Sequence, residues 1–77
     1  MIKSTLVDFL ENMGVQKSVL NNDPNVFADG IIDSLQAIDY LVMIEEKFNI
    51  NITMNMVIES KLGRLSDMAR YIEESFR

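Results

Sequence analysis

The stretch from Asp29 to Phe48, which reads DGIIDSLQAIDYLVMIEEKF, decides the fold of this 77-residue chain. After Ser34, apolar residues recur at mixed steps of three and four residues, which is typical of one apolar face of a helix. Asp33 is a good N-cap because its carboxylate can accept hydrogen bonds from the free N–H groups of a first turn. The pattern predicts a loop that runs into a helix from Ser34 to about Phe48, with Ser34 facing solvent. The expected inward residues are Leu35, Ile38, Leu41, Val42, Ile44 and Phe48.

The part of the chain before this stretch predicts one helix and a long connection. Apolar residues from Ile2 to Met13 follow a helical period, and Gly14 comes directly after the last of them. Residues 15–28 contain the dense turn signal NNDPN and the chain's single proline. We expect a long loop there, with a possible helical turn at residues 17–20.

The part after it predicts a loop and two further helices. Asn49 or Asn51 suits a left-handed C-cap, and Ile50 and Ile52 are expected to point inward. A short third helix is expected from Met54 to Lys61, and Ser66 is expected to cap the last helix. The predicted fold is all-α: one domain over residues 1–77, a small four-helix bundle with a long first loop and a short third helix. The expected inward residues of these two helices are Met54, Val57, Ile58, Met68, Ala69, Ile72 and Phe76.

Composition narrows the possible functions. The chain has no cysteine and no histidine, so it lacks thiolate ligands, a disulfide framework and the commonest general base. Its net charge is −5, and residues 29–48 hold five acidic side chains against one lysine. An acidic surface argues against nucleic acid and favours partners with basic patches. We see no signal peptide and no membrane-length apolar run, so we expect a cytoplasmic monomer that binds no metal.

Gly30, Asp33, Ser34 and Leu35, followed by a helix that ends in Glu45-Glu46-Lys47-Phe48, resemble the acyl carrier protein family, which includes peptidyl and aminoacyl carriers. A weaker similarity extends over almost the whole chain. In that family the serine of Asp-Ser-Leu carries 4′-phosphopantetheine, derived from coenzyme A, through a phosphodiester. The resemblance implies a stand-alone carrier with the arm on Ser34.

The resemblance also implies how such a carrier works. A separate phosphopantetheinyl transferase would modify Ser34, and the terminal thiol of the arm would hold an acyl or aminoacyl group as a thioester. Loading enzymes and downstream synthases would then dock through basic patches. The chain itself is not expected to be an enzyme, because no base is linked by any motif to Ser34.

The site residues are assigned by position. Asp33 is expected to order the turn, and Leu35 to contact the arm or to join the core. The residues expected to face partners are Gln36, Asp39 and Glu46. An acyl chain could lie against Ile52, Met54 and Val57, although core packing explains these residues equally well.

Two features depart from the fatty-acid type of carrier. Gln36 stands where an acid is usual, and the third-helix region is rich in Asn and Met, which favours a carrier of a specialised pathway. The alternative function is an unmodified helical module that keeps the carrier fold and binds a partner through its acidic face. Ser34 would then be an ordinary serine at a helix start.

Overall fold

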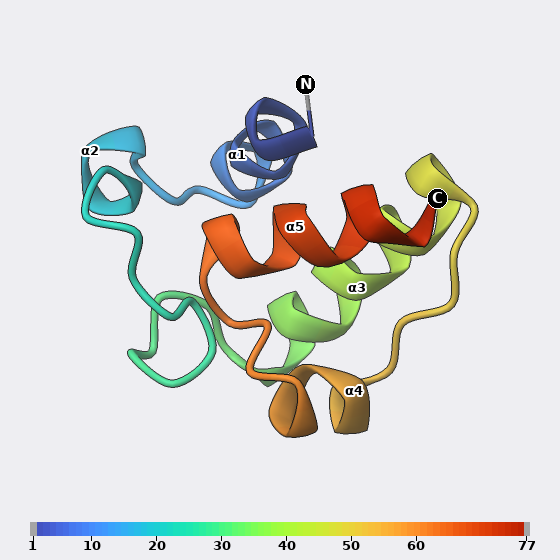
Figure 1. The fold of residues 1–77 in the computed structure, drawn as a ribbon. Helices are drawn as coiled ribbons and strands as arrows, with labels where there is room; N and C mark the ends of the chain where they lie inside the picture. The colour runs from blue at the N-terminus through green and yellow to red at the C-terminus, as the bar shows by residue number, and fades with distance from the viewer. Residues whose placement is uncertain (1, 77) are drawn as a thin grey trace.

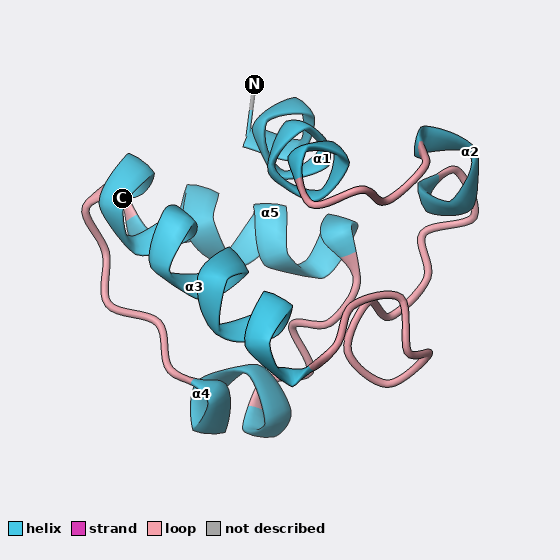
Figure 2. Cartoon of the chain, turned by 180° about the vertical axis from the view of Figure 1, so that it is seen from behind, coloured by secondary structure: helices cyan, strands magenta, loops and turns pink. Residues whose placement is uncertain are grey.

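The chain folds into an all-helical bundle in a computed structural model that describes residues 2–76 (Figures 1 and 2). The elements are α1 (Ile2–Asn12), α2 (Lys17–Leu20), α3 (Ser34–Phe48), α4 (Met54–Glu59) and α5 (Leu65–Ser75). Helix α1 crosses over α5 and α3, and α4 lies at the opposite side of the molecule. The predicted four-helix bundle is confirmed, with α2 as the single turn expected within the long connection.

One core holds the helices together. Tyr40 is its largest fully buried side chain, and its ring lies 5.9 Å from that of Phe27, centroid to centroid. Every helix and the loops of residues 21–33, 49–53 and 60–64 contribute to the core. Packing against this shared core stabilises the short helices more than their intrinsic propensity does. The buried residues are Leu6, Leu10, Leu20, Val26, Ile32, Ala37, Tyr40, Leu41, Ile44, Ile52, Val57, Leu62, Leu65, Met68 and Ile72.

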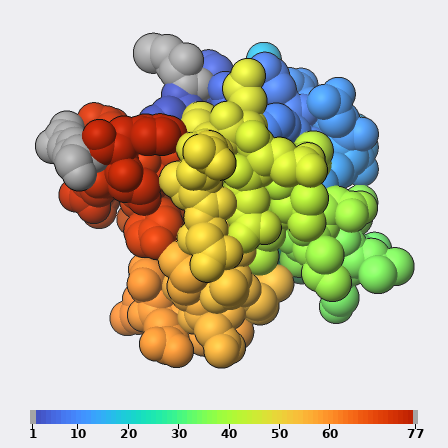
Figure 3. All heavy atoms as spheres, turned by 90° about the vertical axis from the view of Figure 1, so that its right-hand side faces the viewer, coloured from blue at the N-terminus to red at the C-terminus, as the bar shows by residue number. Residues whose placement is uncertain are grey.

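The helix ends follow standard capping chemistry. Gly14 has φ +96°, and the Val15 N–H donates to the Leu10 carbonyl at 3.1 Å, which closes a Schellman motif after α1. Asn49 ends α3 in the left-handed conformation, as one of the two predicted positions. The loop of residues 49–53 then runs across one face of the molecule to α4 (Figure 3), and the Ile52 N–H donates to Glu45 Oε2 at 3.0 Å.

The predicted apolar face of α3 was wrong in part. Leu35, Ile38 and Val42 are exposed, while the buried residues are Ala37, Tyr40, Leu41 and Ile44. Apolar side chains occur nearly all round this helix, so periodicity alone selected a stripe that was too wide. At about 100° per residue, Leu35, Asp39, Val42 and Glu46 share the face opposite the core.

The inward prediction also failed at three other residues. Met54 and Ile58 are exposed in the six-residue α4, which buries only Val57. Phe76 is exposed as well, and its ring lies 6.4 Å from that of Phe48. A helix of fewer than two turns has too few positions to define a face by its period.

Ser66 is not the cap of α5, which corrects another prediction. The helix begins two residues earlier than predicted, at Leu65, and its N-cap Arg64 makes no side-chain hydrogen bond. Instead Asp23, in the long loop, accepts from the Ser66 N–H at 3.2 Å and from the Ser66 hydroxyl. A carboxylate from a distant segment therefore caps this helix and ties the loop to it.

We expect this contact to make stability depend on acid pH. Burial raises the pKa of Asp23, but the Ser66 hydrogen bonds and the charges of Lys3 and Arg64 lower it more, so it lies below its ordinary value of 3.8. The stabilisation is therefore present above pH 3.8 and is lost as pH falls through the lower folded-state value. Asp23→Ala should reduce the free energy of unfolding near pH 7 by about 1–2 kcal/mol, measured by urea denaturation.

Asp23→Asn is the matched control for that prediction. Asp23 has φ +52°, a conformation that asparagine also tolerates, and an amide oxygen can still accept one hydrogen bond. The asparagine variant should lose less stability than the alanine variant. The gap between wild type and Asp23→Asn should shrink as pH falls below 3.8; a gap that stays constant would contradict a role for the charge.

Candidate functional site

Ser34 is the first residue of α3 and is exposed. In the loop that precedes Ser34, Gly30 has φ +70°. The buried Ile32 donates its N–H to the Val26 carbonyl at 3.2 Å, so this loop is anchored to the core. Within the described residues, no hydrogen bond engages the Ser34 hydroxyl, whereas the hydroxyls of Ser66 and Ser75 are both bonded. Ser34 therefore presents a free hydroxyl on a fixed backbone.

A capping box orders the turn beneath this hydroxyl. Asp33 Oδ1 accepts from the Gln36 N–H at 2.8 Å, and Gln36 Oε1 accepts from the Asp33 N–H at 3.0 Å. The Gln36 amide also donates to the Met13 carbonyl at 3.3 Å, which joins the start of α3 to the end of α1. The predicted cap at Asp33 is confirmed. Gln36 is half-buried, and both the oxygen and the nitrogen of its side-chain amide make hydrogen bonds. Its expected contact with partners stays a prediction.

This helix start fits a phosphodiester on Ser34. The N–H groups of Ser34 and Leu35 have no acceptor within the part of the chain that is described. These donors and the helix dipole favour a negative group at this end.

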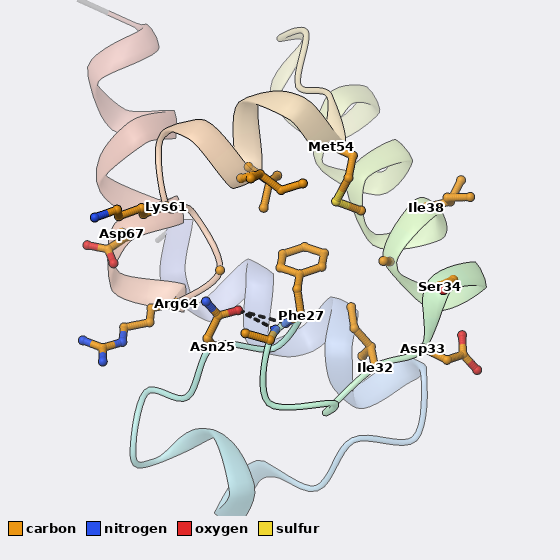
Figure 4. Close-up of a pocket in the computed structure, with 15 residues that line it drawn as sticks. Asn25, Phe27, Ile32, Asp33, Ser34, Ile38, Met54, Lys61, Arg64 and Asp67 are labelled. Carbon is orange, nitrogen blue, oxygen red and sulfur yellow. Dashed lines mark hydrogen bonds between the residues drawn. The ribbon is translucent and has the colours of Figure 1, made fainter.

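A hollow of about 1090 Å³ lies beside Ser34, between α3 and α4 (Figure 4). Phe27 points into its middle, and the walls there are apolar side chains from both helices and the long loop. Met54 and Val57 line the hollow, as the hypothesis of an acyl-chain site requires, whereas Ile52 is buried and does not line it. An apolar group attached to Ser34 could therefore be buried in this hollow while the core side chains keep their positions. The apolar walls are Phe27, Ala28, Ile32, Ala37, Ile38, Met54, Val57 and Ile58.

The outer face of α3 carries the other predicted site residues. Leu35 is 75% exposed, which excludes its alternative assignment to the core. Asp39 and Glu46 are exposed on the same face as Leu35 and Val42, and no ion pair engages either acid among the described residues. The helix thus offers apolar side chains interleaved with two unpaired acids. Glu45 is half-buried and bonded to the loop of residues 49–53, which gives it a structural role.

Sequence reasoning missed the contact that shapes the floor of the hollow, which is the turn of residues 25–28. Asn25 Oδ1 accepts from the N–H groups of Phe27 at 3.1 Å and Ala28 at 2.9 Å, so one side chain sets the turn that carries Phe27 (Figure 4). The Val26 N–H donates to the Gly63 carbonyl at 3.0 Å, next to an isolated bridge between Asn25 and Arg64. Asn25 within a turn-rich run was a signal for local hydrogen bonding, but nothing in the sequence indicated its distant partner.

Comparison with known proteins gave one match. A family model described as "Phosphopantetheine attachment site" matches residues 6–72. No curated protein and no solved structure matched significantly. The matched range covers α2 to α4 completely, most of α1 and α5, the hollow and the helix start at Ser34. None of the helices in the described residues has the length and hydropathy needed to cross a membrane.

Proposed function

Because the chain belongs to the phosphopantetheine-attachment family of carrier proteins, whose prosthetic group is 4′-phosphopantetheine, we propose that Ser34 carries this arm. The protein would hold an acyl or aminoacyl group as a thioester on the arm and present it to partner enzymes. The observation that carries the proposal is the free, exposed hydroxyl of Ser34 at the start of α3, beside two unpaired N–H groups.

The attachment step needs a separate enzyme. The Ser34 oxygen bonds to the phosphorus nearest the pantetheine of coenzyme A, the bond between the two phosphates breaks, and the adenosine bisphosphate leaves. The transferase must accept the serine proton, because this chain has no histidine and no described base bonds to Ser34. The new phosphodiester then meets the free N–H groups and the positive end of the helix dipole.

The hollow supports an apolar acyl portion in the cargo. Its walls are mainly apolar, and burial of each methylene there contributes about 0.8 kcal/mol relative to water. The arm would move the thioester between this hollow and the active site of a partner at high effective concentration.

The outer face of α3 is the proposed docking surface. Leu35 and Val42 supply apolar contact, and Asp39 and Glu46 supply charge that basic patches on a transferase or synthase can steer toward. We include Gln36 in this surface only at its edge, because its amide already bonds within the fold.

Charge reversal on this face should weaken docking. We expect Asp39→Lys and Glu46→Lys each to raise the KM of a phosphopantetheinyl transferase about five- to tenfold at low salt, and less at high salt. Glu11 is an exposed residue of α1, so Glu11→Lys makes the same change in net charge away from this face and is the control. Equal effects of all three variants would show that net charge, and not this face, governs docking.

The proposed function is tested by intact mass spectrometry of the chain before and after incubation with coenzyme A and a broad-specificity transferase. A gain of one phosphopantetheine, located on Ser34 by fragmentation, is expected. A folded chain that gains no mass with several transferases would favour the unmodified interaction module. Attachment at another serine would overturn the assignment of Ser34.

A further inference from the structure

The two ends of the hollow differ in charge. Ser34 lies at one end, and Lys61 and Arg64 lie at the other, with Phe27 between them (Figure 4). The charged groups of Lys61 and Arg64 lie at the edge of the hollow and point away from its middle. Both cations are exposed, whereas the walls between them and Ser34 are mainly apolar.

These cations are available to a ligand. The acid at this end of the hollow is Asp67, whose carboxylate lies 3.7 Å from Arg70 on the next turn of α5. No ion pair joins Lys61 or Arg64 to an acid within the described residues. Arg64 also acts at longer range on Asp23, which is bonded to Ser66. The end opposite Ser34 is therefore locally positive in a chain of net charge −5.

The backbone at Lys61 supplies a second, independent observation. Lys61 has φ +55°, and the Leu62 N–H donates to the Val57 carbonyl at 2.9 Å, which makes Lys61 the C′ residue after α4. Glycine is the residue that this position favours, since a side chain strains the left-handed conformation. Lys61 therefore stands at this end of the hollow in a backbone conformation that favours glycine, and strain of this kind points to function.

We propose that the cargo is an acyl chain whose far end is a carboxylate, which Lys61 and Arg64 hold at the end of the hollow opposite Ser34. This inference rests on the proposed function. The methylenes lie along the apolar walls, and the carboxylate stays hydrated beside two cations and avoids desolvation. A methyl end would gain nothing from these cations, and an ammonium end would be repelled by them.

The test uses a thiol in place of the serine. The chain contains no cysteine, so Ser34→Cys places a single thiol at the start of α3. An iodoacetamide arm of pantetheine length alkylates it and ends in an alkyl chain with an isotope-labelled carboxylate. NMR titration at low ionic strength then measures the pKa of that carboxylate on the protein and on the free arm.

We expect the carboxylate on the protein to have an acid dissociation constant about two- to fivefold larger than on the free arm, that is, a lower pKa. Lys61→Gly and Arg64→Gln should each remove much of this shift, while Lys17→Gln, which removes a charge far from the hollow, should not. Lys61→Gly also relieves the backbone strain, so its melting temperature should not fall and unfolding cannot explain a lost shift.

A pKa equal to or above that of the free arm would overturn the proposal, because an arm that floats beside an acidic protein has its carboxylate pKa raised. The result is separate from the proposed function, since chemical attachment needs no transferase. A failed mass gain would refute carriage of phosphopantetheine, whereas an unshifted or raised pKa would refute the anionic cargo alone.

Discussion

Ser34→Ala should abolish phosphopantetheine attachment and leave the fold unchanged. The substitution removes the oxygen that must bond to phosphorus, so no residual transfer at this position is expected. The capping box is made by Asp33 and Gln36, and the Ser34 hydroxyl makes no hydrogen bond within the described residues. We therefore expect a change of less than about 0.5 kcal/mol in the free energy of unfolding. Intact mass and urea denaturation measure the two effects.

Ser66→Ala is the matched control, with the opposite pattern expected. Its hydroxyl donates to the Asp23 carboxylate, so its loss should lower the free energy of unfolding by about 1–2 kcal/mol. Attachment at Ser34 should continue, because Ser66 does not line the hollow. If Ser34→Ala still gained phosphopantetheine, or if it unfolded the chain, Ser34 would not be the free nucleophile that we propose.

The start of α3 was predictable because its signals are local. Asp33 as a cap and Ser34 at the first helical position both depend on neighbours within a few residues. The reciprocal hydrogen bond, from the Asp33 N–H to the Gln36 side chain, was not predicted. Gln36 looked like a substitution on a docking face, yet it closes the capping box and bonds to Met13. The same polar residue types occur in helix caps and on docking surfaces, so only the structure shows which role Gln36 has.

The buried faces were less predictable for a different reason. Helix α3 has more apolar residues than one face can hold, and the structure leaves Leu35, Ile38 and Val42 exposed. Periodicity finds a helix well, but it cannot decide which of two apolar stripes meets the core when both exist. The exposed stripe is itself informative, since apolar side chains that are left in water on a carrier are a reason to expect docking.

Long-range pairs were beyond any local pattern. Asp23 caps α5 from 43 residues away, and Asn25 contacts Gly63 and Arg64, which also lie far from it along the chain. From the sequence, Asp23 and Asn25 each predict only a local turn. Their partners follow from the packing of the whole bundle, so the floor of the hollow could not be derived from the sequence.

Gly63→Ala should destabilise the protein more than any other single substitution considered above, by about 3–5 kcal/mol. A Cβ at the buried Gly63 would fall far inside contact distance of three side-chain atoms of Asn25. Asn25 cannot simply rotate away, because its Oδ1 accepts from the N–H groups of Phe27 and Ala28. Overpacking costs about 1–3 kcal/mol, and each lost hydrogen bond adds about 1 kcal/mol. Urea denaturation followed by circular dichroism measures the loss.

A double-mutant cycle separates this clash from a general intolerance of alanine. Asn25→Ala removes the three clashing atoms, so Gly63→Ala should cost much less in that background, with a coupling of about 1–2 kcal/mol. Gly14→Ala is the control for glycine loss: its Cβ would meet nothing within 4 Å, and only the positive φ opposes it, at about 1 kcal/mol. If the two substitutions at residues 25 and 63 were additive, the contact between them would not hold the loop that carries Phe27. The floor of the hollow would then have to be supported by the core residues Val26 and Ile32 alone.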